Sequence, residues 1–308
     1  MKKIFTLLLF CFNISTFAQV EIKVQPFLPE LFSQYPSVRD LTISPNEDEA
    51  YFSAQSILGE VSVIVRIKKE NRKWTKPEIA PFSGKFNDLE PFLSHDGLRL
   101  YFASDRPIGD LSDKKDYDIW YVERTLNGPW SNPINMGDVI NTKQNEFYPS
   151  VAKNGNIYFT TERKDTKGKD DIYFSQWKDD HYTNPISLSE SINTNAYEFN
   201  AYVSSDESYI IFTGYRWKDG LGSGDLYISY NKNGIWTKAK NLGRKINSDQ
   251  MDYCPFVNAK TKTMYFTSRR SVLNKTTFNS HNELLYEITR YSNGSSRIYK
   301  VTLTNKID

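Results

Sequence analysis

Short segments in which apolar and polar residues alternate recur along this chain at regular intervals, and each is typical of a β-strand. The clearest are three copies of one pattern, Asp118-Ile119-Trp120, Asp171-Ile172-Tyr173 and Asp225-Leu226-Tyr227. Two further patterns recur with it, Trp130-Ser131-Asn132-Pro133, Tyr182-Thr183-Asn184-Pro185 and Trp236-Thr237-Lys238-Ala239, and Ile140-Asn141-Thr142, Ile192-Asn193-Thr194 and Ile246-Asn247-Ser248. A repeat of 52 to 58 residues built from strands predicts an all-β fold, a β-propeller with one four-stranded sheet in each blade.

Each repeat contains four strand predictions in the same order. The first strand is short and apolar, and the second carries an aromatic residue such as Phe102. Asp96-Gly97 and Asn154-Gly155 mark the turn between them, because both residue pairs tolerate positive φ. The third strand begins with the Asp-Ile-Trp pattern. The fourth carries the Trp-Ser-Asn-Pro pattern and is expected at the outer edge, where proline costs no ladder hydrogen bond.

These segments predict one propeller domain over residues 40–308, with five blades at about 40–87, 88–141, 142–193, 194–247 and 248–303. Blade five holds the longest insertion, about 271–282, and we expect its third and fourth strands at 284–291 and 297–303. Residues 19–39 precede the first blade, and an alternating segment at 20–24 is expected to close the ring by joining the last blade. The alternative is that this region contributes to a sixth blade.

The first residues resemble a secretory signal peptide. Lys2 and Lys3 precede an apolar run over 4–12, and Ala18 provides a small residue at the expected cleavage site, so residues 1–18 are predicted to be removed. The bulky Phe10 before Cys11 argues against a lipoprotein signal. The mature chain is therefore expected to be exported, periplasmic or cell-surface or secreted, and soluble.

The composition and net charge of the chain limit the kinds of partner and linkage that we expect. Aromatic residues make up 15% of the chain, which favours strands. Removing Lys2 and Lys3 leaves 37 basic residues against 37 acidic ones, so no basic field indicates nucleic acid. Cleavage also leaves Cys254 as the single cysteine, which excludes an intramolecular disulfide. We expect no transmembrane segment, no cofactor and a monomer.

Arginines and aspartates recur together in blades two, three and four. Each arginine lies five residues after the tyrosine position of strand two, which is Tyr101 in blade two, and each aspartate opens strand three. Blade one has Ser56 and Ser62 at these positions, so it lacks both residues together. The paired loss predicts that the two side chains meet as structural pairs. The pairs are Arg106 with Asp118, Arg163 with Asp171, and Arg216 with Asp225.

A carboxylate stands three residues before the proline position of strand one in four blades, as Asp88, Glu146, Glu198 and Asp252. Because strand one lines the channel of a propeller, these groups are candidate binding residues near one channel mouth. Alternatives are a channel Ca²⁺ site, which nothing else in the sequence supports, and acid–base roles in a glycosidase. The structural interpretation is that each carboxylate bonds locally in its own blade. Repetition favours it, since catalysis needs different groups placed asymmetrically round one substrate.

The segment Pro91 to Arg106, with the pattern Pro-x-x-Ser-x-Asp-Gly-x-x-Leu-Tyr-Phe-x-Ser-Asp-Arg, resembles the WD-like repeat of TolB-type propeller proteins of the exported kind found in Bacteroidetes-like bacteria. The resemblance covers roughly residues 88–303. It implies a propeller and a periplasmic or surface binding scaffold, and it identifies no ligand.

Catalytic motifs are absent from the sequence. No G-x-S-x-G pattern occurs, and the three histidines lack metal-ligand spacing, so we predict no catalytic residue and no metal ligand. Positions without counterparts in other blades are therefore candidate binding residues, namely Trp217 and, in the blade-five insertion, His281. We predict a non-catalytic binding or scaffold module that contacts a protein or cell-envelope glycan. The alternative is a glycan-active enzyme that uses the channel-mouth carboxylates.

Overall fold

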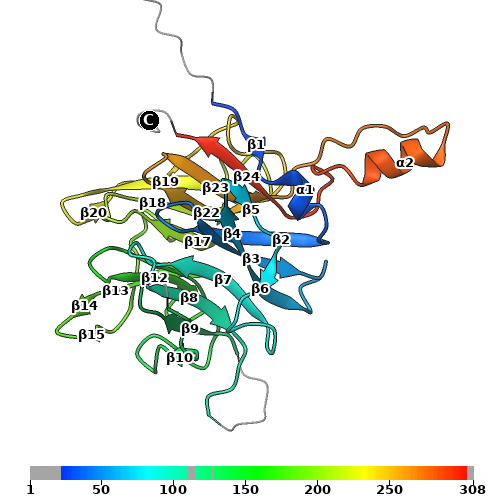
Figure 1. The fold of residues 1–308 in the computed structure, drawn as a ribbon. Coiled ribbons are helices and arrows are strands. Elements are labelled where there is room, and N and C mark those ends of the chain that lie inside the picture. The colour runs from blue at the N-terminus through cyan, green and yellow to red at the C-terminus, as the bar shows by residue number, and fades with distance from the viewer. Residues whose placement is uncertain (1–21, 110–115, 127, 304–308) are drawn as a thin grey trace, which may run out of the picture.

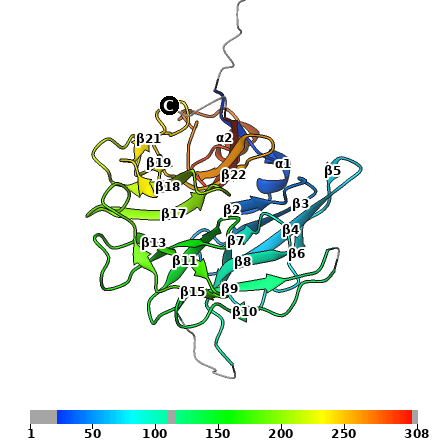
Figure 2. The same cartoon turned by 90° about the vertical axis from the view of Figure 1, so that its left-hand side faces the viewer.

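The computed structural model describes residues 22–109, 116–126 and 128–303, and its sheets are arranged as five blades around a common axis (Figure 1). Figure 2 shows the innermost strands β2, β7, β11, β17 and β22 gathered around the centre. The predicted all-β, five-bladed propeller is therefore confirmed, and the alternative of a sixth blade is wrong. The predicted signal peptide lies outside the described residues.

Within each blade the strands pair antiparallel, outward from the axis. Blade one contains β2 (Ser37–Ile43), β3 (Glu49–Gln55), β4 (Ser62–Glu70), β5 (Lys73–Trp74) and β6 (Glu78–Ile79). Blade two contains β7 (Asp88–Leu93), β8 (Arg99–Ser104), β9 (Asp118–Glu123) and β10 (Ile134–Asn135). Blade three contains β11 (Glu146–Val151), β12 (Ile157–Thr161), β13 (Asp171–Ser175) and β16 (Ile186–Ser187), with a small hairpin of β14 (Trp177–Lys178) and β15 (His181–Tyr182).

Blade four contains β17 (Tyr197–Val203), β18 (Tyr209–Tyr215), β19 (Gly224–Lys232), β20 (Ile235–Trp236) and β21 (Lys240–Asn241). Blade five contains β22 (Asp252–Asn258), β23 (Thr263–Ser268), β24 (Arg297–Thr302) and β1 (Gln25–Pro26). Its outermost strand thus comes from the other end of the chain, since Pro26 pairs with Tyr299. The expected ring closure occurs, but the strand lies at 25–26 rather than at 20–24. The short helix α1 (Pro29–Phe32) follows it.

The insertion in blade five differs from its prediction. The segment expected to be a third strand at 284–291 is mainly the helix α2 (His281–Ile288), which stands well away from the blades (Figure 1). Ser280 is the N-cap, and its hydroxyl accepts a hydrogen bond from the backbone N–H of Glu283. A Ser followed three residues later by Glu is a helix-start signal. The segment 297–303, expected as the fourth strand, instead supplies the third.

A phenylalanine of strand two is completely buried in every blade and forms a repeated core position. The five are Phe52, Phe102, Phe159, Phe212 and Phe266. The Trp-Ser-Asn-Pro pattern serves the contact between blades, because its aromatic ring packs on the strand-two tyrosine of the preceding blade. The indole N–H of Trp130 donates to the hydroxyl of Tyr51 at 2.8 Å, and the Trp236 ring lies 6.2 Å from that of Tyr158.

The Ile-Asn-Thr pattern replaces part of a fourth strand. In blade three the Asn193 side chain accepts from the backbone N–H of Ile172 at 3.0 Å and donates to its carbonyl at 2.8 Å. Asn141 and Asn247 do the same for Ile119 and Leu226. One buried amide therefore accepts from the N–H of a strand-three residue and is a second donor to its carbonyl, which also accepts the backbone N–H of the outer segment, as Ile172 does from Leu188 at 3.0 Å.

We expect Asn193→Ala to lower the free energy of unfolding by about 1–3 kcal/mol, because it leaves the buried N–H of Ile172 without its partner and removes one of the two donors to the Ile172 carbonyl. Chemical denaturation with a spectroscopic readout measures the change. The exposed Asn184→Ala is the matched control and should unfold like the wild type. Equal midpoints for the two variants would contradict this role.

Candidate functional site

The four repeated carboxylates begin the innermost strands of blades two to five and are completely buried. Each accepts a hydrogen bond from a Ser or Thr hydroxyl in the loop that arrives from the preceding blade. The bonds are Ser83 to Asp88 at 2.7 Å, Thr142 to Glu146 at 2.6 Å, Thr194 to Glu198 at 2.6 Å and Ser248 to Asp252 at 2.7 Å. We call this arrangement the interblade latch. It occupies the carboxylates inside the protein instead of presenting them to a ligand.

The arginines join the same latch. Arg106 contacts Asp88 at 2.5 Å and Arg270 contacts Asp252 at 2.8 Å, while the nearest Arg163 nitrogen lies 4.0 Å from Glu146. Each guanidinium also donates to a carbonyl of the incoming loop, for example that of Ile140 at 2.6 Å. The predicted pairs with the strand-three aspartates are therefore wrong. The guanidinium lies over an aromatic ring of strand three, as that of Arg270 does over Tyr299 at 4.7 Å, and its ion pair is with the strand-one carboxylate.

The strand-three aspartates organise the loop before their own strand. Asp171 accepts from the backbone N–H groups of Lys167 and Gly168, and Asp225 accepts from those of Leu221 and Gly222. Each aspartate also bonds a polar side chain of the outer strand, as Asn135 does with Asp118 at 2.8 Å. Their recurrence thus reflects a loop cap in blades three and four.

In blade four Trp217 takes the place of the arginine. Its indole N–H donates to Glu198 at 2.7 Å, and its ring packs on Tyr227 at 4.3 Å, where the guanidinium of other blades lies over the equivalent rings. Gly214 makes room for it, since a Cβ there would lie within about 3 Å of the Trp217 ring. Arg216 has a φ of 58° and is exposed. Trp217 therefore belongs to the latch, and Arg216 does not pair with Asp225 as predicted.

Blade one has an apolar version of the latch. Val38 stands where the carboxylate stands in the other blades, opposite Ala54, and both Phe32 and Tyr35 pack on the ring of Phe52. Ser56 replaces the arginine because no carboxylate is present to receive it. The loss of arginine in blade one thus accompanies the loss of the strand-one acid.

His281, the remaining candidate, is the exposed first residue of α2. In the part of the chain that the structure describes, no group of three or more His, Cys, Asp and Glu side chains is arranged to hold a metal ion. Nor does any helix of that part combine the length and the apolar character needed to cross a membrane.

The blades differ at one position near the axis. The third residue of the pattern on strand one forms a β-bulge with a left-handed backbone in all five blades, with φ between 49° and 59°. The residues are Asp40, Glu90, Tyr148, Asn200 and Cys254. None is glycine, so every blade carries the steric cost of this conformation. The backbone is repeated while the side-chain chemistry is different each time.

These side chains meet through Arg39, and we call Arg39 with the five bulge residues the axial cluster. The Arg39 guanidinium contacts Asp40 at 2.8 Å and Glu90 at 2.7 Å, and it lies 3.4 Å from the Cys254 sulfur. Glu90 also accepts from the backbone N–H of Tyr148 at 2.7 Å and from Asn200 at 3.2 Å. The network joins all five blades, and Arg39, with 19% of its side chain exposed, is its accessible member.

Burial sets the protonation of this cluster. It raises the pKa of Glu90 to about 7, against the opposing effect of Arg39, and it raises the pKa of the Cys254 thiol well above its usual value. The Oδ2 atom of Asp40 is buried and has no hydrogen-bond donor in the described part of the chain. The sequence analysis did not predict this cluster, because it relied on residues that the blades share. The cluster could have been found from the aligned strand-one position that holds a different residue in every blade.

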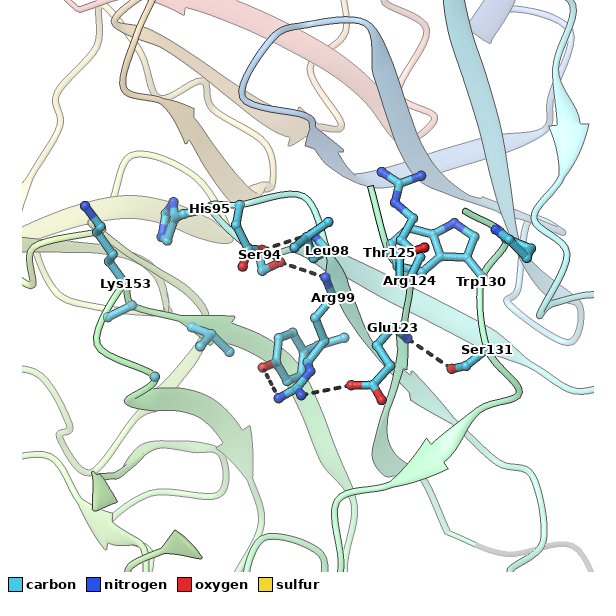
Figure 3. Close-up of a pocket in the computed structure, with 16 residues that line it drawn as sticks. Ser94, His95, Leu98, Arg99, Glu123, Arg124, Thr125, Trp130, Ser131 and Lys153 are labelled. Atoms are coloured by element: carbon cyan, nitrogen blue, oxygen red, sulfur yellow. Dashed lines mark hydrogen bonds and ion pairs between the residues drawn. The ribbon is translucent and has the colours of Figure 1, made fainter. Parts of the chain in front are cut away.

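An open pocket of about 1090 Å³ lies between blades two and three (Figure 3). Figure 3 shows Lys153 and His95 on one side and Arg99 with Glu123 on the other. The volume is at the upper end of the range for ligand sites, ~300–1,000 Å³. Its polar lining is specific to these blades, since the position of Arg99 holds Glu49, Asn156, Tyr209 and Thr263 elsewhere.

Comparison with known proteins establishes the fold alone. No protein-family model and no curated protein sequence matches the chain. Among solved structures, the GH43 endo-arabinanase from Bacillus licheniformis is 14% identical, with a TM-score of 0.53 over 88% of this chain and 95% of that one. The endo-arabinase from Bacteroides thetaiotaomicron VPI-5482 gives the same values.

TolB from Acinetobacter baumannii is 13% identical, with a TM-score of 0.49 over 87% of this chain. This chain spans 55% of the length of that TolB, and 76% of the putative TolB from Agrobacterium tumefaciens. The class defined by the described fold is the five-bladed propeller.

We expect Trp217→Ala to lower the free energy of unfolding by about 2–3 kcal/mol, because it removes a packed ring and one donor to buried Glu198. Arg216→Ala should change it by less than about 0.5 kcal/mol. Chemical denaturation of both variants distinguishes them, and the reverse order would show that Arg216 serves the latch.

The raised pKa of Glu90 predicts a pH effect on stability. Because the folded-state pKa lies above the unfolded value, the contribution of Glu90 is fully present below about pH 4.5 and is lost as pH rises through about 7. Glu90→Gln should therefore lose less stability than the wild type between pH 5 and pH 8, by about 2–3 kcal/mol. Denaturation curves across this range measure the slopes. Exposed Glu30→Gln should keep the wild-type slope, and an unchanged slope in Glu90→Gln would exclude the ionisation of Glu90 as the cause.

Proposed function

We propose that this protein is an exported, non-catalytic binding module, and that a cell-envelope glycan occupies the pocket between blades two and three. The observation that carries the proposal is the pocket itself. It combines the half-buried Trp130 and the apolar side chains of Leu98 and Val151 with charged groups that reach solvent. Apolar and aromatic surfaces with a few placed polar groups are typical of small-ligand sites, and rings of this kind accept the C–H face of a sugar.

The interblade latch supports the non-catalytic part of the proposal. The acids considered for catalysis, for example Glu146, are buried, and local hydrogen bonds occupy them. A glycosidase needs two carboxyl groups that flank a substrate bond at separations of ~5–9.5 Å. The latch carboxylates each face the incoming loop of a different blade instead.

A glycan-active enzyme is a second candidate because of the axial cluster. Glu90, with a pKa raised to about 7 by burial, and Asp40 share one guanidinium, and a carboxyl group with a raised pKa beside a second carboxyl group is a usual basis of acid–base catalysis. Both acids are almost completely buried beneath Arg39. A substrate would have to displace that arginine, so binding without turnover is the better-supported function.

A protein partner is supported by α2. The only buried residue of this helix is the charged Glu287, whereas Leu285 and Ile288 are 41% and 47% exposed. This is the reverse of the usual arrangement for a helix that packs on its own domain. Such a contact is compatible with a glycan in the pocket, because the pocket residues come from blades two and three.

Binding of the mature protein to soluble envelope polysaccharides tests the proposal. We expect Leu98→Trp, which fills the pocket, to weaken binding about tenfold or more, a loss of about 1.4 kcal/mol or more. The matched control is Leu126→Trp, since Leu126 is 80% exposed and does not line the pocket. Equal binding by both variants would place the ligand elsewhere.

The same polysaccharide incubations are assayed for new reducing ends. We expect none from the wild type. Turnover that disappears in Glu90→Gln, with folding intact, would instead establish the enzyme and overturn the non-catalytic function.

A further inference from the structure

We propose that the pocket between blades two and three recognises a sugar that carries a carboxylate, with Lys153 and Arg99 as the anion-binding groups. This inference rests on the proposed glycan-binding function and narrows its ligand class. The two cations come from different blades, and Figure 3 shows Lys153 at the left of the pocket lining and Arg99 near its middle. We place the acidic group of the ligand in the pocket that both cations line.

Lys153 is the cation of the lining that favours an anion. Arg124 pairs with Glu49 and Arg99 pairs with Glu123, so the charges of both arginines are balanced by neighbouring carboxylates. Asp96 is already committed to its own turn, where its carboxylate accepts from the hydroxyl of Ser94 at 2.6 Å and from the N–H of Leu98 at 2.9 Å. The Lys153 ammonium is exposed, and among the described residues no group forms a hydrogen bond or ion pair with it that a ligand would have to break.

Arg99 is available at little cost. Arg99 forms an ion pair with Glu123 at 3.0 Å, and the two side chains are 40% and 49% exposed, respectively. Exposed pairs of this kind contribute little to stability. The guanidinium is kept in place by the ring of Tyr121, 4.6 Å away, and by a long contact of 3.4 Å to the hydroxyl of Tyr101. A planar guanidinium held in this way suits two parallel hydrogen bonds to a carboxylate.

The far wall of the pocket is fixed before any ligand arrives. The Arg124 guanidinium stacks on the Trp130 ring at 4.1 Å and contacts Glu49 at 2.7 Å. The indole N–H of Trp130 donates to Tyr51, whose hydroxyl donates to the same Glu49 at 2.8 Å. This closed ring of contacts orients Trp130 without using Arg99 or Lys153, so the wall and the anion site are separable by mutation.

The pocket suits a sugar better than an acidic peptide. A peptide that binds by strand addition needs unpaired backbone groups at a sheet edge. Here the N–H of Glu123 is bonded to the Ser131 hydroxyl, and its carbonyl accepts from the Ser131 N–H. The lining therefore offers side chains and ring faces, which match hydroxyl and carboxylate groups on a compact ring.

Calorimetric titration with matched probes tests the inference. The probes are oligogalacturonate and oligoglucuronate, their uncharged galactose and glucose counterparts, and a hexaglutamate peptide. We expect the uronates to bind at least about tenfold more tightly than the neutral sugars, and their affinity to fall as salt rises. Lys153→Ala and Arg99→Gln should each weaken uronate binding about tenfold and leave neutral sugars unaffected.

Two further variants separate recognition from folding. Glu123→Gln removes the carboxylate that competes for Arg99, so uronate binding should become severalfold tighter, which a merely structural residue would not produce. Lys260→Ala removes an exposed lysine from the corresponding turn of blade five, outside the pocket, and should bind like the wild type.

The outcomes distinguish the inference from the function on which it rests. Neutral sugars that bind as tightly as uronates, in a manner blocked by Leu98→Trp, would overturn the inference and keep the glycan-binding function. No binding of any sugar at about 1 mM would overturn both. Hexaglutamate binding in place of sugar would identify an acidic peptide site and overturn the sugar assignment.

Discussion

The structure depends on a buried carboxylate that holds the start of the innermost strand to the loop from the preceding blade in blades two to five. Sheets in a propeller make no continuous backbone ladder with one another. Isolated backbone hydrogen bonds join them, such as that from the N–H of Glu146 to the carbonyl of Tyr117 at 2.8 Å, and side chains supply the other contacts. Glu146 shows the principle, since one side chain receives both the hydroxyl and the N–H of Thr142. Because a buried acid with an unpaired oxygen is costly, the loop is fixed as firmly as the strand. Packing of the strand-two phenylalanines against neighbouring blades follows from that alignment.

The latch also shows how one physical requirement accepts several chemistries. An arginine, the indole of Trp217 and, in blade one, the apolar Phe32 each cover the start of an innermost strand. Other positions vary among the blades and take no part in the latch. The axial cluster and the pocket of Arg99 differ among blades although their backbone is repeated, so blade assembly does not require their particular residues. We place the chemistry of the molecule at such positions.

The fold was predictable because strand periodicity and turn residues recur in every blade, and repetition averages out local ambiguity. The partners of the charged residues could not be predicted in the same way. Spacing paired Arg106 with Asp118, whereas the structure pairs it with Asp88, because the course of the loop after strand two decides which carboxylate it reaches. The segment of α2 was predicted as a strand because its leucines and tyrosine are compatible with one, although Ser280 provides a helix N-cap. Pocket residues such as Lys153 and Arg99 belong to different blades, and no local pattern states that their side chains share one opening.

The pairing of β1 with β24 makes the closure of the ring a non-covalent joint between the two ends of the described chain. Four blades consist of residues that are close in sequence. The fifth blade is complete only when β24 pairs with β1, which lies near the other end of the chain and is synthesised first. Contacts between such distant residues form late, because the loop they close is long. The molecule is therefore a ring that can open at one place. A circular permutation that linked the two strands and cut another loop would move that opening, and with it the site where unfolding begins, without altering any blade.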